Sequence, residues 1–407
     1  MERNTDSISR IMTLRYDPLA NPVRLPLRPS DFTPTVRHDI DGLIESAARK
    51  EILTLHDTLR YDRVAMSLSG GIDSRLTLSM ILRFLPGARV SCVSMGFGDS
   101  DDEIGAAREI ARTQDCDFVP LIVEDVLADL PQLIGIVKEP RWNLYQYYTL
   151  LEGKKMSNIF YTGDGGDETF GGYTFRYQKY LSLVAANETW QQKVKAYLSC
   201  HERDWVPDQQ ELFGTAVCFS WDAIYELLRP SFDNNLPMLD QVFLADFNGK
   251  LLFDWLPANI SFSASLGLRI ESVFLTEPII RLATHIPWEM KYDTTANTGK
   301  LPLVRLLSKY EGRPITTSKK GFSLNLVSMW KKYGRKTVDM YVNGKSEVVK
   351  NGLISGRWVD KTMRSLQPES LELNPRYINK MLSVLALEIW YRIFVSKTMK
   401  VSQKLGS

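Results

Sequence analysis

The sequence predicts an α/β protein in which a doubly wound parallel sheet, with helices on both faces, is followed by a helical lobe. Apolar runs of strand length alternate with helical patterns between residues 36 and 175, which is the order of elements that a parallel sheet requires. Loops of small and acidic residues directly follow two of these runs. Beyond residue 176 the apolar residues recur almost wholly at helical spacing. We therefore divide the chain into residues 1–35, 36–175 and 176–407.

The first segment, residues 1–35, is expected to be an extended lead-in. Four prolines lie between Asn21 and Thr35, and a proline inside a helix removes a hydrogen bond and clashes with the preceding turn. From Val36 to Leu59 the spacing becomes helical, because five apolar residues fall on one side of a helix: Ile40, Leu43, Ile44, Ala47 and Ala48.

The second segment, residues 36–175, carries the predicted sheet and two glycine-rich loops. Short apolar runs predict strands at 63–68, 89–95, 118–123 and 158–162. The stretches between the first three strands have helical spacing, at 75–84 and 103–112. The third segment, residues 176–407, is predicted to be a helical lobe that packs against this sheet.

Composition narrows the class of protein. The chain has 407 residues, 44% hydrophobic and 24% charged, an ordinary globular balance that excludes disordered and coiled-coil proteins. A formal net charge of +2 gives no reason to expect a nucleic-acid partner. The four cysteines and four histidines are too scattered for a disulfide framework or a zinc site. Because no stretch reaches the length of a spanning helix and no apolar signal region begins the chain, we expect a cytoplasmic protein without a membrane partner.

The first loop whose residues could bind a ligand is Ser69-Gly70-Gly71-Ile72-Asp73-Ser74. It connects a predicted strand to a predicted helix. Two adjacent glycines allow the backbone to approach a phosphate, and the helix that follows presents free N–H groups. Ser69 and Ser74 can add hydroxyl donors, whereas Asp73 suits a phosphate only if Mg²⁺ lies between them. A plain strand-to-helix turn has a similar composition and stays open as an alternative.

Other nucleotide-binding motifs do not fit this loop. The chain contains no G-x-x-x-x-G-K-[ST] run, so transfer of a terminal phosphoryl group by a Walker A loop is not expected. The dinucleotide fingerprint G-x-G-x-x-G is also absent after this strand.

The second loop is Gly163-Asp164-Gly165-Gly166-Asp167-Glu168, which follows another predicted strand. Loops that follow parallel strands meet at one edge of the sheet, so Asp73 and Asp167 can bind the same Mg²⁺. Three carboxylates within five residues repel one another unless a cation or hydrogen bonds offset the charge. A solvated acidic turn is the alternative interpretation.

Together the runs SLSGGIDS and TGDGGDETFGGY resemble the synthetase domain of the asparagine synthetase family, a branch of the PP-loop ATP pyrophosphatases (adenine nucleotide alpha hydrolase-like proteins). Ser94 and Gly96, with Asp102 and Glu103 downstream, look like the family's adenine-side strand and acidic helix start. Further similarity is found at Glu139-Pro140, Leu256-Pro257, residues 264–268 and Lys319-Lys320-Gly321-Phe322. The likeness runs from about Val36 to Leu326.

This resemblance implies roles for individual residues. It implies that ATP is bound through its pyrophosphate by Ser69, Gly70, Gly71, Asp73 and Ser74, and further by Ser94, Gly96 and Gly163. Mg²⁺ would be bound by Asp73 and Asp167, and Lys319 would stabilise the departing pyrophosphate. Asp164 would lie beside the reacting acyl group.

The chain departs from the family pattern in three ways. Where the family usually has E-x-R, this chain has Arg269-Ile270-Glu271, so acid and base are exchanged. The exchange either preserves a structural ion pair or alters the acyl pocket. Asp164 stands where many members have Glu. The amino-terminal glutaminase domain is not expected, because Met1 is not followed directly by a cysteine and the first cysteine is Cys92.

The resulting hypothesis is an ATP- and Mg²⁺-dependent ligase that adenylates a carboxylic acid and then transfers the acyl group to ammonia or an amine. Asparagine synthesis from aspartate is the first candidate. A lactam or amide synthetase acting on another carboxylic acid and a non-catalytic nucleotide-binding relative are the alternatives. Free ammonia, a separate amidotransferase subunit and an amine within the substrate remain open as nitrogen sources.

Two other stretches have simpler interpretations. The basic stretch Lys331–Lys350 is interrupted by acidic residues and is expected to be a solvated surface. The aromatic run Trp142–Tyr148 is expected to be the packed start of a helix, with Tyr145, Tyr147 or Tyr148 as a secondary candidate to face the substrate.

Overall fold

A five-stranded parallel sheet organises the computed structural model, which describes residues 5–98, 102–185, 187–315, 324–367 and 372–406. Its strand order is β3-β2-β1-β4-β5. The strands are β1 (Arg63–Ser67), β2 (Arg89–Gly96), β3 (Asp117–Ile122), β4 (Ile159–Thr162) and β5 (Arg269–Ser272), and every neighbouring pair is parallel. The four strands expected from the sequence are therefore confirmed within one or two residues.

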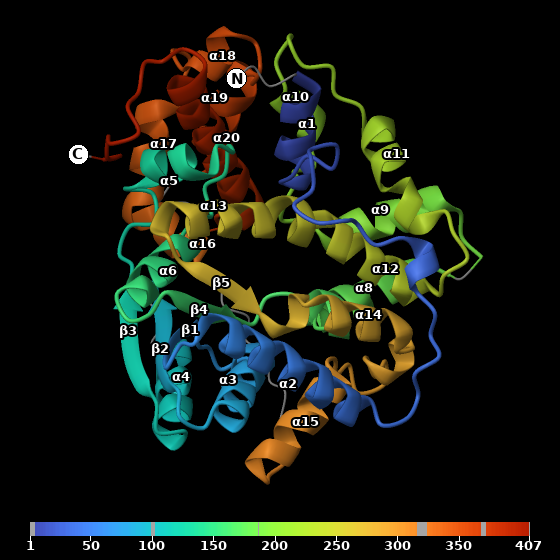
Figure 1. Ribbon diagram of the computed structural model, residues 1–407. Coiled ribbons are helices and arrows are strands. Elements are labelled where there is room, and N and C mark those ends of the chain that lie inside the picture. The colour runs from blue at the N-terminus through green and yellow to red at the C-terminus, as the bar shows by residue number, and fades with distance from the viewer. Residues whose placement is uncertain (1–4, 99–101, 186, 316–323, 368–371, 407) are drawn as a thin grey trace.

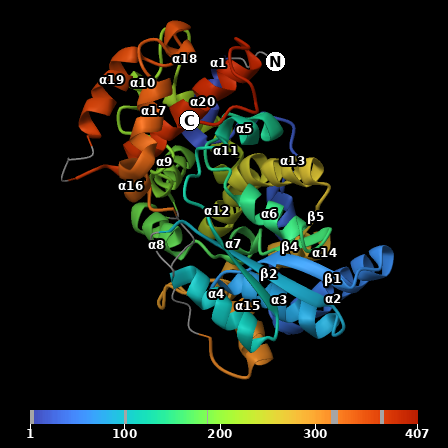
Figure 2. The ribbon, with the colours of Figure 1, turned by 90° about the vertical axis from the view of Figure 1, so that its left-hand side faces the viewer.

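Helices cover both faces of this sheet, which confirms the predicted α/β class. On one face lie α2 (Ile40–Leu59), α3 (Ile72–Phe84), α4 (Asp102–Thr113), α14 (Glu277–His285) and α15 (Leu301–Glu311). On the other lie α5 (Leu130–Val137), α6 (Gln146–Lys154), α13 (Leu256–Leu266) and α20 (Pro375–Phe394). Figure 1 shows α2, α3 and α15 below the strands and α6 and α13 above them, and Figure 2 shows the same two layers from the side. Each face has its own apolar core, so the central strands are buried on both sides.

The rest of the chain is mainly helical, as the spacing predicts. A third apolar cluster joins α8 (Thr174–Leu183), α9 (Trp190–Cys200), α11 (Trp221–Phe232) and α12 (Met238–Asp246). The π-helix η2 (Phe247–Trp255) connects this cluster to α13. The shorter helices are α7 (Gly166–Phe170), α10 (Gln209–Leu212), α16 (Leu326–Met329), η5 (Trp330–Gly334), α17 (Arg335–Tyr341), α18 (Glu347–Lys350) and α19 (Gly356–Ser365). The lysines at 331, 332, 336, 345 and 350 are exposed, as expected for a solvated surface.

The amino-terminal segment is not extended throughout, which corrects the expectation for residues 1–35. Residues Thr5–Leu14 form helix α1, which contacts α20 from the opposite end of the chain. Ile8, Ile11 and Met12 recur at helical spacing and are buried, so this helix gains stability from tertiary packing. The proline-rich residues 21–35 contain no α-helix and only a single 3₁₀ turn at Pro29–Asp31.

The boundary expected at residue 175 is also not a clean division. Strand β5 comes from the predicted helical lobe and pairs with β4 in the sheet. Helix α15 returns to pack on α3, where Leu303, Leu306 and Leu307 are fully buried. Residues 269–311 therefore belong to the sheet layer, because their strand β5 pairs with β4 and their helix α15 packs on α3.

Among the described residues, no helix is both long enough and apolar enough to span a membrane. The four cysteines are free thiols.

A matched pair of leucines tests whether the amino-terminal segment is an integral part of the fold. Leu14 is 4% exposed in the third cluster, whereas Leu19 is 66% exposed. We expect Leu14→Ala to lower the free energy of unfolding by about 2–5 kcal/mol, because it leaves a cavity in the core. Leu19→Ala should change it by less than about 0.5 kcal/mol. Urea unfolding followed by circular dichroism measures both, and equal effects would contradict the packing of this segment.

Candidate active site

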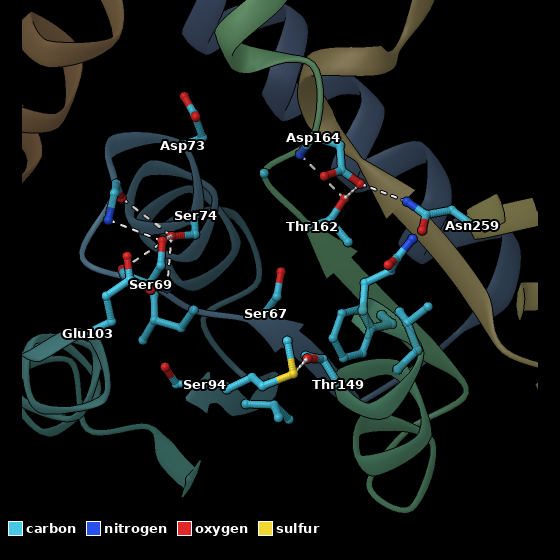
Figure 3. A pocket seen from close by; sticks show the side chains of 18 of the residues that line it. Ser67, Ser69, Asp73, Ser74, Ser94, Glu103, Thr149, Thr162, Asp164 and Asn259 are labelled. Atoms are coloured by element: carbon cyan, nitrogen blue, oxygen red, sulfur yellow. Dashed lines mark hydrogen bonds between the residues drawn. The ribbon is translucent and has the colours of Figure 1, made fainter. Parts of the chain in front are cut away.

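A cavity of about 330 Å³ lies where the carboxyl ends of β1, β2 and β4 meet. One side is formed by the loop between β1 and α3, by Ser94 on β2 and by Glu103 on α4. The other side is formed by Thr162 and Asp164 after β4 and by Asn259 on α13 (Figure 3). The position is the one at which α/β sheets usually bind ligands.

The loop between β1 and α3 is held in shape by its two serines. The Ser74 hydroxyl accepts a hydrogen bond from the Ser69 amide at 3.1 Å and contacts the Ser69 hydroxyl at 3.1 Å. The Gly71 amide donates to Ser69 Oγ at 3.2 Å, and α3 begins at the next residue. The loop therefore presents hydroxyl groups and a helix N-terminus at the cavity, a combination that suits phosphate.

Most of the predicted nucleotide-binding residues line this cavity. Those that do are Ser69, Gly71, Asp73, Ser74, Ser94 and Gly163. Gly70 and Gly96 are not among its lining residues. A Cβ atom on Gly96 would approach Ile104 Cδ1 to 2.8 Å, so this glycine allows β2 and α4 to pack closely.

Asp164 lies on the side of the cavity opposite residues Ser69–Ser74, which we call the serine loop. Its carboxylate accepts hydrogen bonds from Thr162 Oγ1 at 2.9 Å and from Asn259 Nδ2 at 3.0 Å. Desolvation raises the pKa of Asp164, although the two hydrogen bonds oppose that shift. Its backbone carbonyl accepts from Ser272 Oγ at 2.6 Å, which ties this loop to β5.

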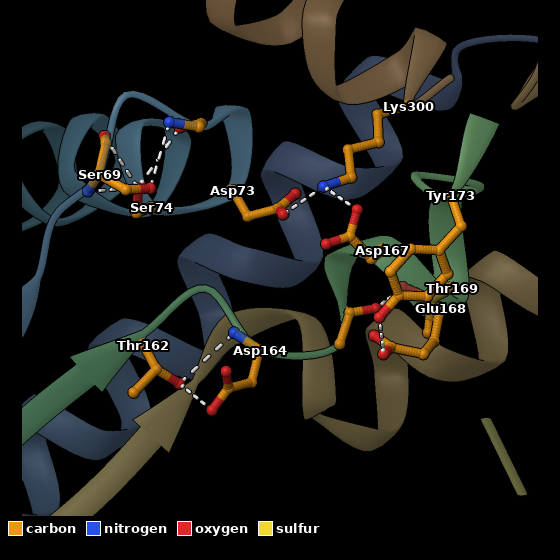
Figure 4. A network of polar contacts seen from close by, with 12 residues as sticks. Ser69, Asp73, Ser74, Thr162, Asp164, Asp167, Glu168, Thr169, Tyr173 and Lys300 are labelled. Carbon is orange, nitrogen blue, oxygen red and sulfur yellow. Dashed lines mark hydrogen bonds and ion pairs between the residues drawn. The ribbon is translucent and has the colours of Figure 1, made fainter. Parts of the chain in front are cut away.

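Asp73 and Asp167 come from the two different loops and meet at the ammonium group of Lys300 (Figure 4). Lys300 forms a close ion pair with Asp73, and its Nζ lies 2.7 Å from Asp167 Oδ1. Burial lowers the pKa of Lys300, but the two carboxylates outweigh it and raise the pKa above its usual value. A single cation therefore offsets the repulsion between the two acids.

Glycines make this approach of the two loops possible. A Cβ atom on Gly166 would overlap the carboxylate of Asp73, and one on Gly172 would overlap Asp167 and Lys300. A Cβ atom on Gly163 would lie 2.9 Å from the Ser74 amide nitrogen. The glycine-rich loop after β4 thus lets its backbone lie directly against the start of α3.

The donor set fits a magnesium ion that is shared with phosphates. Asp73 and Asp167 are two oxygen ligands that already converge on one positive charge. Mg²⁺ in nucleotide sites is usually bound by one or two carboxylates plus phosphate oxygens rather than by a full protein cage. The part of the chain described contains no group of three or more His, Cys, Asp or Glu side chains placed to bind a metal.

Sequence reasoning missed Lys300 because it lies in none of the motifs quoted above. It is the N-cap of α15, has a left-handed φ of 56°, and donates its backbone amide to Phe170 O at 3.1 Å. Its neighbours Gly299, Leu301 and Pro302 indicate the start of a helix, and they give no sign of a functional lysine. The predicted lysine, Lys319, lies outside the described residues.

Two further carboxyl groups near the site have raised pKa values. Desolvation raises the pKa of Glu103, which lines the cavity, to about 7. Desolvation and the neighbouring charge of Asp167 raise the pKa of Glu168 to about 7, and Glu168 Oε1 accepts a hydrogen bond from the Tyr173 hydroxyl at 2.6 Å.

The exchanged pair Arg269 and Glu271 lies away from the cavity. The two side chains form an ion pair of 2.5 Å with each other along β5. They line a separate hollow between β5 and α2, together with Tyr161 and Thr58. Neither is among the described residues that line the cavity beside Asp164, so the pair fits the interpretation of a structural ion pair.

The aromatic run before α6 contributes one tyrosine to the cavity. Tyr145 lines it and is followed by Gln146, the first residue of α6, whereas Tyr147 and Tyr148 do not line it. The other lining residues that the sequence did not indicate include Thr149, Trp255 and Asn259.

A family model for asparagine synthase matches residues 58–392. The chain belongs to the asparagine synthase family. This membership confirms the resemblance that the two glycine-rich loops suggested.

The matches to individual relatives cover less than half of each relative's length. Asparagine synthetase [glutamine-hydrolyzing] 1 of Bacillus subtilis is 26% identical over 303 residues, covering 64% of this chain and 46% of that protein. Asparagine synthetase [glutamine-hydrolyzing] of Gallus gallus is 25% identical over 175 residues, covering 40% and 30%. This chain thus spans less than half the length of these relatives. The match to the solved NMN synthetase from Francisella tularensis covers 50% of this chain and 92% of that one, at 14% identity and with a TM-score of 0.27.

Removing the shared cation should destabilise the site even without substrates. We expect Lys300→Met to lower the free energy of unfolding by about 3 kcal/mol, because two carboxylates then face each other without a cation. The double variant Lys300→Met/Asp167→Asn should recover part of that loss. Lys309→Met, which removes an exposed ion pair from the same helix, should cost less than about 1 kcal/mol. Urea denaturation measures the free energy of unfolding of the wild type and the three variants. A loss in Lys300→Met no larger than in Lys309→Met would contradict this account.

Glu168 should make stability depend on pH. Its pKa is raised from 4.5 to about 7, so its contribution to stability is fully present below pH 4.5 and is lost as pH rises through 7. We expect Glu168→Gln to reduce the fall in unfolding free energy between pH 5 and pH 8, the remainder including the contribution of Glu103. The exposed Glu124→Gln serves as control and should leave the slope unchanged. An unchanged slope for Glu168→Gln would disprove the assignment.

Proposed function

We propose that this protein is an ATP- and Mg²⁺-dependent amide-forming ligase, which adenylates a carboxylic acid and then joins the acyl group to ammonia or an amine. The observation that carries the proposal is the convergence of Asp73 and Asp167 on one positive charge, next to the serine loop and opposite Asp164. Family membership supports the reaction class.

The serine loop has the chemistry to bind the pyrophosphate part of ATP. Ser69 and Ser74 offer hydroxyl groups, and the N-terminus of α3 offers free amides. Ser94 and Gly163 line the same cavity and complete the proposed nucleotide side. Attack of a carboxylate oxygen on the α-phosphorus would release pyrophosphate, whose growing charge needs cationic partners.

Asp73 and Asp167 are the residues that would bind Mg²⁺. The ion, when bound together with ATP, would neutralise charge on the leaving pyrophosphate. Lys300 forms ion pairs with both carboxylates, so its ammonium group is a second source of positive charge near the proposed metal site. Lys319 remains a proposed second lysine for the leaving group.

Asp164 would act in the second half of the reaction. Its raised pKa suits a group that accepts a proton from the attacking nitrogen while the acyl carbon gains its new bond. Thr162 and Asn259 fix the orientation of its carboxylate. In this proposal the nucleotide would bind beside Ser69 and Ser74 and the acyl group beside Asp164, on the two sides of one cavity (Figure 3).

Aspartate is the first candidate for the acid, because the relatives named above are asparagine synthetases. Those relatives are described as glutamine-hydrolysing; for this chain we propose free ammonia, a separate amidotransferase subunit or an amine within the substrate as nitrogen source. A lactam or amide synthetase on another acid is the alternative. The free cysteines suit the proposed cytoplasmic location.

The decisive experiment separates the two half-reactions. With ATP, Mg²⁺ and aspartate, ATP–pyrophosphate exchange reports adenylation, and product mass with ammonia, glutamine or no nitrogen source reports amide formation. We expect Asp167→Asn to lower exchange by about 10²–10³-fold, since a charge-stabilising group at the transition state is lost. Asp164→Asn should lower amide formation far more than exchange.

The exposed Asp117→Asn is the control and should keep wild-type rates. Full exchange in Asp167→Asn would contradict the proposed mechanism. ATP binding without exchange for any carboxylic acid offered would instead favour a non-catalytic nucleotide-binding protein.

A further inference from the structure

The side of the cavity opposite the serine loop contains two side-chain amides with polar atoms that have no hydrogen-bond partner among the described residues. They are Gln146, at the first turn of α6, and Asn259, at the first turn of α13. Both helices lie on the same face of the sheet and contact each other. The site therefore has hydrogen-bonding capacity beyond Asp164.

Asn259 is nearly buried, with 7% of its surface exposed. Its Nδ2 donates to Asp164 Oδ2 at 3.0 Å, and because a carboxylate only accepts, this bond fixes which end of the amide faces Asp164. Oδ1 must then point elsewhere, and it has no hydrogen-bond partner among the described residues. A buried amide oxygen without a partner is uncommon in folded proteins.

Gln146 shows the same property for both ends of its amide. Neither Nε2 nor Oε1 is accessible to solvent, and neither has a hydrogen-bond partner in the described part of the chain. The residue lines the cavity, so a bound molecule is the natural partner for these atoms.

The charges around the cavity indicate the chemistry of that molecule. Four acidic residues are among the described lining residues, namely Asp73, Glu103, Asp164 and Asp167, and no Lys, Arg or His is among them. On the acyl side the carboxylate and the amide oxygens are acceptors, so the group that fits best is a donor of several N–H bonds.

We propose that Gln146 and Asn259, together with Asp164, form a binding subsite for the nitrogen nucleophile, which is ammonia or a primary amine. This inference rests on the proposed function. An attacking nitrogen must direct its lone pair at the acyl carbon, so its N–H bonds need acceptors on the other side. The amide oxygens of Gln146 and Asn259 supply such acceptors. They favour ammonia over water, because a water molecule has one donor hydrogen fewer than ammonia.

The step is balanced without any further reagent. The nitrogen lone pair forms a bond to the acyl carbon, and the bond from that carbon to the phosphate oxygen breaks. AMP leaves with the electron pair of that bond. One proton of the nitrogen passes to the Asp164 carboxylate, whose position Asn259 holds.

The test compares Gln146→Leu and Asn259→Leu with wild type in both half-reactions, using ammonium chloride and hydroxylamine as nucleophiles. We expect the KM for ammonium to rise by about tenfold or more in each variant, while ATP–pyrophosphate exchange with aspartate stays within about twofold. Gln146→Leu leaves the bond to Asp164 intact and should affect KM alone. Asn259→Leu should also lower kcat for amide formation and increase hydrolysis of the acyl-adenylate.

The control is Asn379→Leu, which removes an amide with the same 7% exposed fraction outside the cavity. Asn379 accepts from Trp142 Nε1 and donates to Arg203 O, so its loss should lower stability without changing the KM for ammonium. A product formed without added amine, with the mass of the acid minus water, would identify an amine within the substrate as the nucleophile bound at this subsite.

Unchanged KM values in both cavity variants, or equal losses in exchange and amide formation, would overturn the amine subsite while the ligase assignment stands. If the wild-type protein shows no exchange with any carboxylic acid, the proposed function fails, and the amine subsite fails with it.

Discussion

The structure of the site depends on one constraint: two like-charged carboxylates from distant loops must lie side by side. Asp73 lies in the first turn of α3 and Asp167 lies in α7, and the buried ammonium of Lys300 holds them together. In a partly buried position the repulsion between two carboxylates is large, so their proximity requires either this lysine or a metal ion. The glycine-rich loop after β4, the start of α15 and the serine loop all meet at this ion-pair cluster.

The helical part of the chain completes the site from the side opposite the serine loop. Helix α13 supplies Asn259, and the turn before it supplies Trp255. A buried ionic network holds these turns: Arg141 pairs with Asp254 at 2.6 Å, and Arg15 lies 3.4 Å from the same carboxylate. Since Arg141 precedes α6 and Arg15 follows α1, this network links the amino-terminal helix to the two helices that carry the cavity amides. Breaking such a pair leaves a buried charge, so the helices are held in a defined orientation.

Family membership and geometry describe different parts of the protein's chemistry. Membership in the asparagine synthase family supports adenylation followed by amide formation. The identity of the acid depends on the side chains that face Asp164, and the exchanged Arg269 and Glu271 are not among the described ones. Gln146 and Asn259 have amide atoms without a partner among the described residues, and these atoms are the basis of the proposed subsite for the nitrogen nucleophile.

The sequence by itself determined the features that arise within short stretches of chain. The strands at 63–68, 89–95, 118–123 and 158–162 follow from local hydrophobic period, and the serine loop closes on itself through Ser69 and Ser74, five residues apart. Sequence reasoning also brought Asp73 and Asp167 together, because parallel strands end at one edge.

Only the tertiary structure decided which distant residues join these loops. Lys300 lies 227 residues from Asp73, and Asn259 lies 95 residues from Asp164. Helix α1 and strand β5 likewise form because α20 and β4 offer surfaces to cover. No local pattern encodes such contacts, since their stability comes from the burial and charge pairing that arise only when the whole chain has folded.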